Sequence, residues 1–224
     1  MIEPRPFWDW GWVFEHLGLI GRQLAEHLVL TFVAVGIGLA ISLPLGVLAY
    51  RRPRTYPPTT YVTGLLYTIP SLAALSLLVP FTGLSTLTAE IALVSYTLLI
   101  LVRNIVAGLR GVPEDVKEAA AGMGYGRRQL LWRVELPLAL PAIVAGVRIA
   151  TVTTIGLVTV TALIGKGGLG RLMLGGFRNL FPEVMIPVAL ALTVLLSLGF
   201  DGALLLMERL LSPWTRRRVL RSAA

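Results

Sequence analysis

The longest polar stretch of this chain, and the first place to look for residues that could do chemistry, runs from Gly108 to Pro141. The stretch separates two long apolar regions and carries carboxylates and cations close together. It cannot lie in hydrocarbon, because its charges and its loop backbone would lack water or partners. A proline followed by two acidic residues suits the first turn of a helix, and glycines at 122, 124 and 126 suit its end. The stretch therefore predicts a short polar helix whose alanines another protein surface can approach closely.

The rest of the sequence offers no constellation for catalysis. The pair Gly165-Lys166 lacks the upstream glycine and the following Ser or Thr of a phosphate-binding loop. His16 and His27 have no carboxylate cluster at metal-ligand spacing nearby, and the chain has no cysteine. We therefore expect no metal site, no cofactor, no disulfide and no enzymatic activity in this polypeptide.

Composition assigns the chain to the membrane proteins. Of its 224 residues 55% are hydrophobic and only 14% are charged, with a mean hydropathy of +0.77. The net charge of +8 does not indicate a nucleic-acid partner, because the basic residues flank apolar runs and are not interleaved with exposed aromatic residues. The lipid bilayer is the expected surrounding.

The apolar runs predict an all-α, polytopic bundle of about five transmembrane helices. Small residues recur every four positions in the first and fourth runs, which favours close helix packing, and Pro70 should kink the second. We expect an extracytoplasmic or interfacial segment over 1–27, a transmembrane domain over 28–210 with a cytoplasmic loop over 108–138, and a basic tail over 211–224. The expected spans are about 28–50, 59–79, 84 or 90–107, 139–164 and 185–207.

The distribution of basic residues predicts the orientation. By the positive-inside rule, the side richer in Lys and Arg is cytoplasmic. We therefore expect the N-terminus outside, and the central loop and the C-terminus in the cytoplasm. The basic residues of the richer side are Arg51, Arg52, Arg54, Arg103, Arg110, Lys117, Arg127, Arg128, Arg133, Arg209, Arg216, Arg217, Arg218 and Arg221, against Arg5, Arg22, Lys166, Arg171 and Arg178 on the other.

Two of the charges within expected spans lie at a similar depth. Arg148 and Asp201 each lie roughly 10 Å from the cytoplasmic side at 1.5 Å of helical rise per residue. Unpaired charges at that depth are costly, so an ion pair between the two helices is plausible. Such a pair would serve packing or, alternatively, gating.

The central stretch resembles the EAA loop of ATP-binding-cassette (ABC) importer permeases. That pattern is Glu-Ala-Ala, three residues, Gly, nine residues, Ile, one residue, Leu-Pro, and this chain departs from it only in having Val134 for the isoleucine. The resemblance implies a coupling helix that docks into a cleft on a separate ATPase, where ATP would be hydrolysed. The residues that carry it are Glu118, Ala119, Ala120, Gly124, Leu136 and Pro137.

Two further stretches narrow the resemblance. YTIPSLAALSLLVP over 67–80 and ALIGKGGLGRLMLGGF over 162–177 look like those of osmoprotectant permeases, the glycine betaine, carnitine and choline class. This implies a type I importer in the inner membrane, with two permease subunits (a copy of this chain or a paralogue), two cytoplasmic ATPases and an extracytoplasmic binding protein. The GGLG element is shared with methionine-type permeases, so import of methionine or another small solute is the alternative. A stand-alone secondary carrier would need internal repeats or a coupling-ion site, and the sequence has neither.

The proline in the second span also suggests a functional site. Pro70 frees a backbone carbonyl, and Thr68 and Ser71 lie close enough to offer hydrogen bonds to it or to a solute. Tyr67 can offer its ring face to a quaternary ammonium group. We hypothesise that Tyr67, Thr68, Pro70 and Ser71 line or gate the translocation path; a structural kink is the alternative.

Overall fold

The computed structural model describes residues 9–178 and 182–211, and this part of the chain is helical throughout, with turns between the helices and no strand. The predicted tail from residue 212 and residues 1–8 of the N-terminal segment lie outside the described residues. In chain order the elements are α1 (Trp10–Glu15), α2 (Leu17–Arg51), η1 (Pro53–Thr55), α3 (Tyr56–Thr68), α4 (Ser71–Thr82), α5 (Thr86–Arg110), α6 (Glu114–Gly122), α7 (Arg127–Leu130), η2 (Leu131–Glu135), α8 (Leu136–Val158), η3 (Thr159–Ile164), α9 (Leu169–Arg178) and α10 (Pro182–Leu211).

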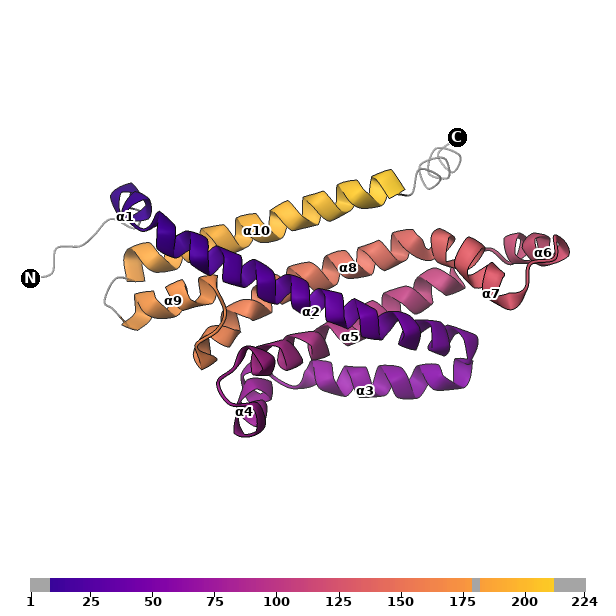
Figure 1. The fold of residues 1–224 in the computed structure, drawn as a ribbon, viewed down its shortest axis with the longest axis horizontal. Helices are drawn as coiled ribbons and strands as arrows, with labels where there is room; N and C mark the ends of the chain where they lie inside the picture. Colours follow the sequence, from indigo (N-terminus) through magenta and orange to yellow (C-terminus); the bar gives the residue numbers. More distant parts are fainter. Residues whose placement is uncertain (1–8, 179–181, 212–224) are drawn as a thin grey trace, which may run out of the picture.

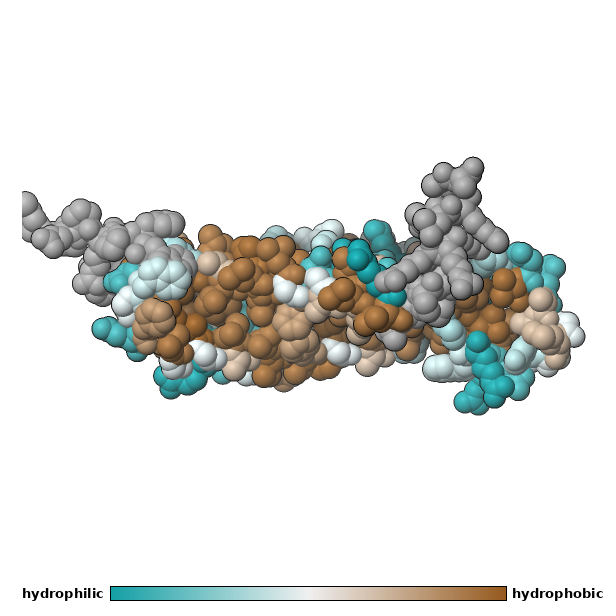
Figure 2. Space-filling model, turned by 90° about the horizontal axis from the view of Figure 1, so that it is seen from above, coloured by the Kyte–Doolittle hydropathy of each residue, from teal (hydrophilic) through white to brown (hydrophobic). Residues whose placement is uncertain are grey.

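The long helices lie side by side along one axis of the molecule (Figure 1). Four segments, 17–51, 86–110, 127–164 and 184–210, are long and apolar enough to cross a membrane, and the bent pair α3–α4 makes a fifth. Figure 2 shows apolar side chains over the middle of the molecule, with hydrophilic groups towards its two ends. The predicted all-α bundle with about five spans is confirmed.

The second span differs from the single kinked helix that we predicted. It consists of two helices, α3 and α4, which meet at an angle of 93°. Ile69 is extended, with ψ of 124°, because the ring of a following proline disfavours the helical conformation. Pro70 then caps the N-terminus of α4. The proline therefore ends one helix and begins another.

The first helix also differs from the prediction, since it begins at Leu17 and not at residue 28. The polar residues among 22–27, which precede the apolar run of the predicted span, continue the helix. Gln23 and His27 are buried, where the backbone of Gly168 in the loop before α9 packs directly against them. Only a glycine at 168 permits that approach, and its φ of +50° suits glycine too. The last predicted span likewise begins earlier than 185, at Pro182.

Small residues set the packing of the central helices, as predicted. On α2 the residues Ala34, Gly38, Ser42 and Gly46 are all buried, and a Cβ at Gly46 would lie 2.6 Å from Ile105 of α5. On α8 a Cβ at Gly146 would lie 2.5 Å from Asn104 of α5. By contrast, a Cβ at Gly36 would meet nothing, so the small face is one stripe of the helix.

The polar stretch is less of a loop than we predicted. Beyond Gly126 the chain forms α7 and a π-helical turn, η2, which lead directly into α8. The helical segment 127–164 is therefore continuous, and the predicted loop over 108–138 reduces to α6 with its two short flanks. Figure 1 shows α6 and α7 at one end of the molecule and α1 and α9 at the other.

Candidate coupling helix and transport groove

Helix α6 projects beyond the ends of α5 and α8 (Figure 1). Its first turn carries Glu114 and Asp115, where the helix dipole favours negative charge. Glu118 and Ala119 are exposed, whereas Ala120 is buried against the molecule. The helix thus presents a carboxylate beside a methyl-sized surface, which leaves room for a partner to approach its backbone.

Gly124 ends α6 through a Schellman motif. Its φ is +85°, which is the left-handed conformation that glycine adopts without strain. The Gly124 N–H donates to the Ala121 carbonyl at 2.9 Å, and the Tyr125 N–H donates to the Ala120 carbonyl at 3.2 Å. The glycine of the EAA pattern is therefore required by the backbone, and its side-chain position is open, since a Cβ there would meet nothing.

Two residues that the sequence reasoning missed, Tyr50 and Glu135, join the end of α2 to the segment after α6. Tyr50, at the end of α2, donates a hydrogen bond of 2.7 Å from its hydroxyl to Glu135 Oε1. Glu135 is buried and lies in the π-helical turn, a feature often found at functional sites. Arg51 adds a 2.9 Å hydrogen bond to the Arg127 carbonyl. A lone glutamate amid apolar residues at the start of α8 was the only available sequence signal.

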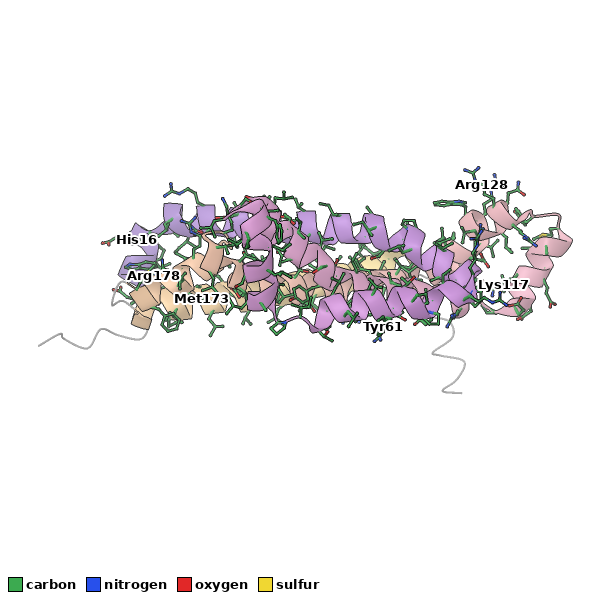
Figure 3. The ribbon with its side chains drawn as sticks, turned by 90° about the horizontal axis from the view of Figure 1, so that it is seen from below. His16, Tyr61, Lys117, Arg128, Met173 and Arg178 are labelled. Carbon is green, nitrogen blue, oxygen red and sulfur yellow. The ribbon has the colours of Figure 1, made fainter. Side chains whose placement is uncertain are left out.

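Lys117 links these groups to α6. Its Nζ lies 3.0 Å from Glu114 Oε2 and 5.7 Å from the centroid of the Tyr50 ring, on the side of the molecule that Figure 3 shows. Partial burial opposes the charged form, yet the interactions with Glu114 and Tyr50 outweigh it and raise the pKa of Lys117. The ammonium therefore stays charged at neutral pH and ties α6 to α2.

Leu136 and Pro137 have different roles at the start of α8. Leu136 is half-buried and packs against the apolar cluster around Leu131 and Ile143. Pro137 is exposed and lies in the first turn of α8, which begins at Leu136. These two residues of the EAA pattern position α8, and neither reaches the exposed face of α6.

Arg148 of α8 and Asp201 of α10 lie together. Arg148 Nε is 2.6 Å from Asp201 Oδ1, and Arg148 Nη1 is 3.8 Å from Glu208 Oε2. Glu208, on the same helix as Asp201, was missed by the sequence reasoning. All three side chains are partly exposed, so the cluster lies at the edge of the bundle.

The break between α3 and α4 brings two tyrosines together. The rings of Tyr67 and Tyr96 meet edge to face, with centroids 6.0 Å apart. The Tyr96 hydroxyl donates to the Ile69 carbonyl, which satisfies a backbone group freed at the break. The Thr68 hydroxyl donates to the Leu65 carbonyl at 2.8 Å.

A groove of about 530 Å³ runs between α3 and α5 beside this break. Of the residues predicted for the path, Tyr67 and Thr68 line it, whereas Pro70 and Ser71 do not. Its lining residues are Pro57, Thr60, Tyr61, Gly64, Leu65, Tyr67, Thr68, Leu99 and Arg103.

The two histidines are separate. His27 Nε2 lies 3.0 Å from the Ile155 carbonyl oxygen, and His16 Nδ1 lies 2.9 Å from that of Trp12. Within residues 9–178 and 182–211, no three His, Asp or Glu side chains are grouped so as to hold a metal.

Comparison with known proteins gives a consistent picture. Carnitine transport permease protein OpuCB of Listeria monocytogenes is 37% identical over 85% of this chain and 87% of the relative. Osmoprotectant import permease protein OsmW of Salmonella typhimurium is 36% identical over 90% and 96%. The inward-facing structure of the MetNI methionine ABC transporter superimposes with a TM-score of 0.80, at 26% identity over 88% of this chain and 98% of that chain.

The predicted type I importer permease fold is confirmed by this likeness. The model of one family, described as "Binding-protein-dependent transport system inner membrane component", matches residues 27–217. That range includes α6, the groove and the five candidate spans except the first turns of α2. The chain therefore belongs to the family of binding-protein-dependent transport inner-membrane components.

Proposed function

We propose that this permease carries a quaternary-amine osmoprotectant, namely glycine betaine, carnitine or choline, into the cell. The relatives with 34–37% identity have names that specify carnitine, choline or osmoprotectant transport. The observation that carries the coupling half of the proposal is the exposed face of α6, ended by the left-handed Gly124. Glu118, Ala119 and Ala120 on α6 and Gly124 after it form the proposed docking surface, with Leu136 and Pro137 holding the following helix.

The proposed assembly contains two ATPases, a second permease subunit and an extracytoplasmic binding protein. ATP is hydrolysed in the ATPases, and this chain has no catalytic role. Closure of the ATPase pair moves α6, and the contacts of Lys117, Tyr50 and Glu135 transmit that motion to α2 and α8. The transport cycle is then an exchange between two states that open on opposite sides.

A reconstituted transporter tests this function. The chain, its ATPase and its binding protein in proteoliposomes should take up labelled glycine betaine, carnitine or choline only when ATP is supplied. Omitting the ATPase should abolish uptake. Methionine uptake alone would favour the second candidate, which is suggested by the likeness to the MetNI structure. Uptake driven by an ion gradient without ATP would contradict the importer assignment.

We also propose that the end bearing α1 and α9 faces outward and the end bearing α6 faces the cytoplasm. The excess of basic residues near α6 supports this orientation. The chain has no cysteine, so single cysteines report cleanly. Glu15→Cys should react with an impermeant thiol reagent added to intact cells, whereas Arg128→Cys should react only after the membrane is opened. Both positions are exposed, and the reverse labelling pattern would contradict the orientation.

The path proposal concerns the α3–α4 break. Tyr67 and Thr68 line the groove, and Pro70 and Ser71 fix the angle at which α4 leaves it. We propose that this region lines or gates the path. We propose that the Arg148–Asp201 pair packs α8 on α10, because its side chains are partly exposed at the edge of the bundle.

A further inference from the structure

Arg103 is a cation on the membrane-spanning helix α5, and among the described residues its side chain has no ion-pair partner. It lies on α5, seven residues before that helix ends at Arg110, which is about 10 Å along the axis. Its side chain is exposed, and no carboxylate of residues 9–178 or 182–211 lies within ion-pair distance of it. Arg148 at a comparable depth is paired with Asp201. An unpaired arginine within a span is costly unless it reaches the membrane interface or faces a water-filled cavity or a ligand.

Arg103 lines the groove between α3 and α5. The groove volume, about 530 Å³, is within the range of small-molecule sites. No acidic residue lines it. Thr60 donates its hydroxyl proton to the Tyr56 carbonyl at 2.9 Å, and Thr68 is similarly engaged with Leu65. The strongest free donor in the groove is therefore the Arg103 guanidinium.

Aromatic rings supply the complementary surface. Tyr61 and Tyr67 both line the groove, and their side chains are 68% and 40% exposed. Figure 3 shows Tyr61 at the outer edge of α3, pointing away from the bundle. Tyrosine ring faces attract quaternary ammonium groups, whereas a guanidinium binds carboxylates by paired hydrogen bonds. The groove thus offers tyrosine rings to the ammonium end of a zwitterion and a guanidinium to its carboxylate end.

We propose that Arg103 binds the carboxylate of a zwitterionic quaternary amine, while Tyr61 and Tyr67 hold its ammonium head. The permease would then select zwitterions such as glycine betaine and carnitine over choline, which has no carboxylate and is repelled by the guanidinium. This inference rests on the proposed function and adds to it a selective step in the membrane. Arg103 is a specificity-determining residue in this scheme.

Arg103→Gln in the reconstituted transporter tests the selection. Losing a charged hydrogen-bond partner should lower uptake of glycine betaine and carnitine about 10- to 100-fold. Choline uptake should not fall and should rise, because the repulsion by the guanidinium is removed. Arg103→Lys keeps the charge but not the paired geometry. Its uptake of glycine betaine and carnitine should therefore lie between that of the parent and that of Arg103→Gln. Equal losses for all three solutes, or no loss, would overturn the inference and would indicate a packing role, for example against the second permease.

Charge rescue distinguishes a role of the Arg103 charge from a role of its side chain in packing. In Arg103→Cys, the reagent methanethiosulfonate ethylammonium restores a cation, whereas methyl methanethiosulfonate adds a neutral group. The cationic reagent alone should recover glycine betaine uptake, and partner subunits without cysteine keep the reaction specific to this site. Rescue by both reagents, or by neither, would contradict the role of the charge.

The unsubstituted transporter separates the two proposals. If it takes up no quaternary amine, the proposed function is wrong, whatever Arg103 does. If it takes up glycine betaine but not choline, the charge-rescue experiment decides the role of Arg103. If it takes up all three and Arg103→Gln leaves their ratio unchanged, only the selection is wrong.

Discussion

Gly124→Trp is expected to abolish ATP-driven uptake while the permease remains folded in the membrane. The left-handed backbone at this position, with φ of +85°, strains any residue with a Cβ by about 1–2 kcal/mol. The site itself is open, because a Cβ would meet no neighbour, so the bundle should survive. The added ring would lie beside the exposed face of α6, where we propose that the ATPase docks, and would keep the two surfaces apart.

Gly124→Asn is the matched control, because asparagine tolerates the left-handed region and is small. It should retain most of the uptake. The measurements are uptake, the ATPase activity stimulated by the binding protein, and the amount of ATPase that co-purifies with the permease. If the tryptophan variant equals the parent in all three, the docking assignment is wrong. A loss in both variants would mean that the partner contacts the glycine backbone itself.

Helix α6 could be predicted because its signals are local. A proline, two acidic residues, a run of good helix formers and a left-handed glycine fall within one short stretch, and each acts on its immediate neighbours. The structure places a helix at Glu114–Gly122 with Gly124 just beyond it. The buried small-residue face of α2 was equally readable, because a period of four in a helix puts such residues on one side.

The contacts that hold this helix to the bundle could not be predicted. Tyr50 and Glu135 are 85 residues apart in sequence, and nothing near either residue indicates the other. The early start of α2 was missed for a related reason. Gln23 and His27 precede the apolar run that predicted the span, yet they pack against a glycine-rich loop far along the chain.

The bend at Pro70 shows that a local rule can predict a bend in a helix and still give the wrong angle. A proline inside a helix removes one hydrogen bond, which predicts a kink. In the structure the angle between the two helices is 93°. The Tyr96 hydroxyl of α5 donates a hydrogen bond to the Ile69 carbonyl, which the break leaves without a helical partner. That hydroxyl comes from a residue 27 positions away, so the size of the bend depends on tertiary structure.

Tyr67→Ala is expected to slow uptake of quaternary amines roughly tenfold, in line with the loss of one cation–π contact of a desolvated cation. The Tyr67 ring lines the groove and stands edge to face with Tyr96. Its truncation should leave the helix break in place, since the Ile69 carbonyl is held by Tyr96 and not by Tyr67. Folding and ATPase stimulation should therefore survive.

Two controls distinguish the path from the kink. Tyr67→Phe keeps the ring and should transport at nearly the parent rate, because the ring face makes the proposed contact. Tyr96→Phe removes the hydroxyl that closes the break and leaves the Tyr67 ring in place, so it should lower thermal stability more than it alters selectivity. Initial uptake rates and unfolding temperatures of the three variants provide the comparison. Parent-like uptake by a well-folded Tyr67→Ala protein would leave the break as a structural element only, because a ring that contacts the passing cation cannot be removed without changing the rate.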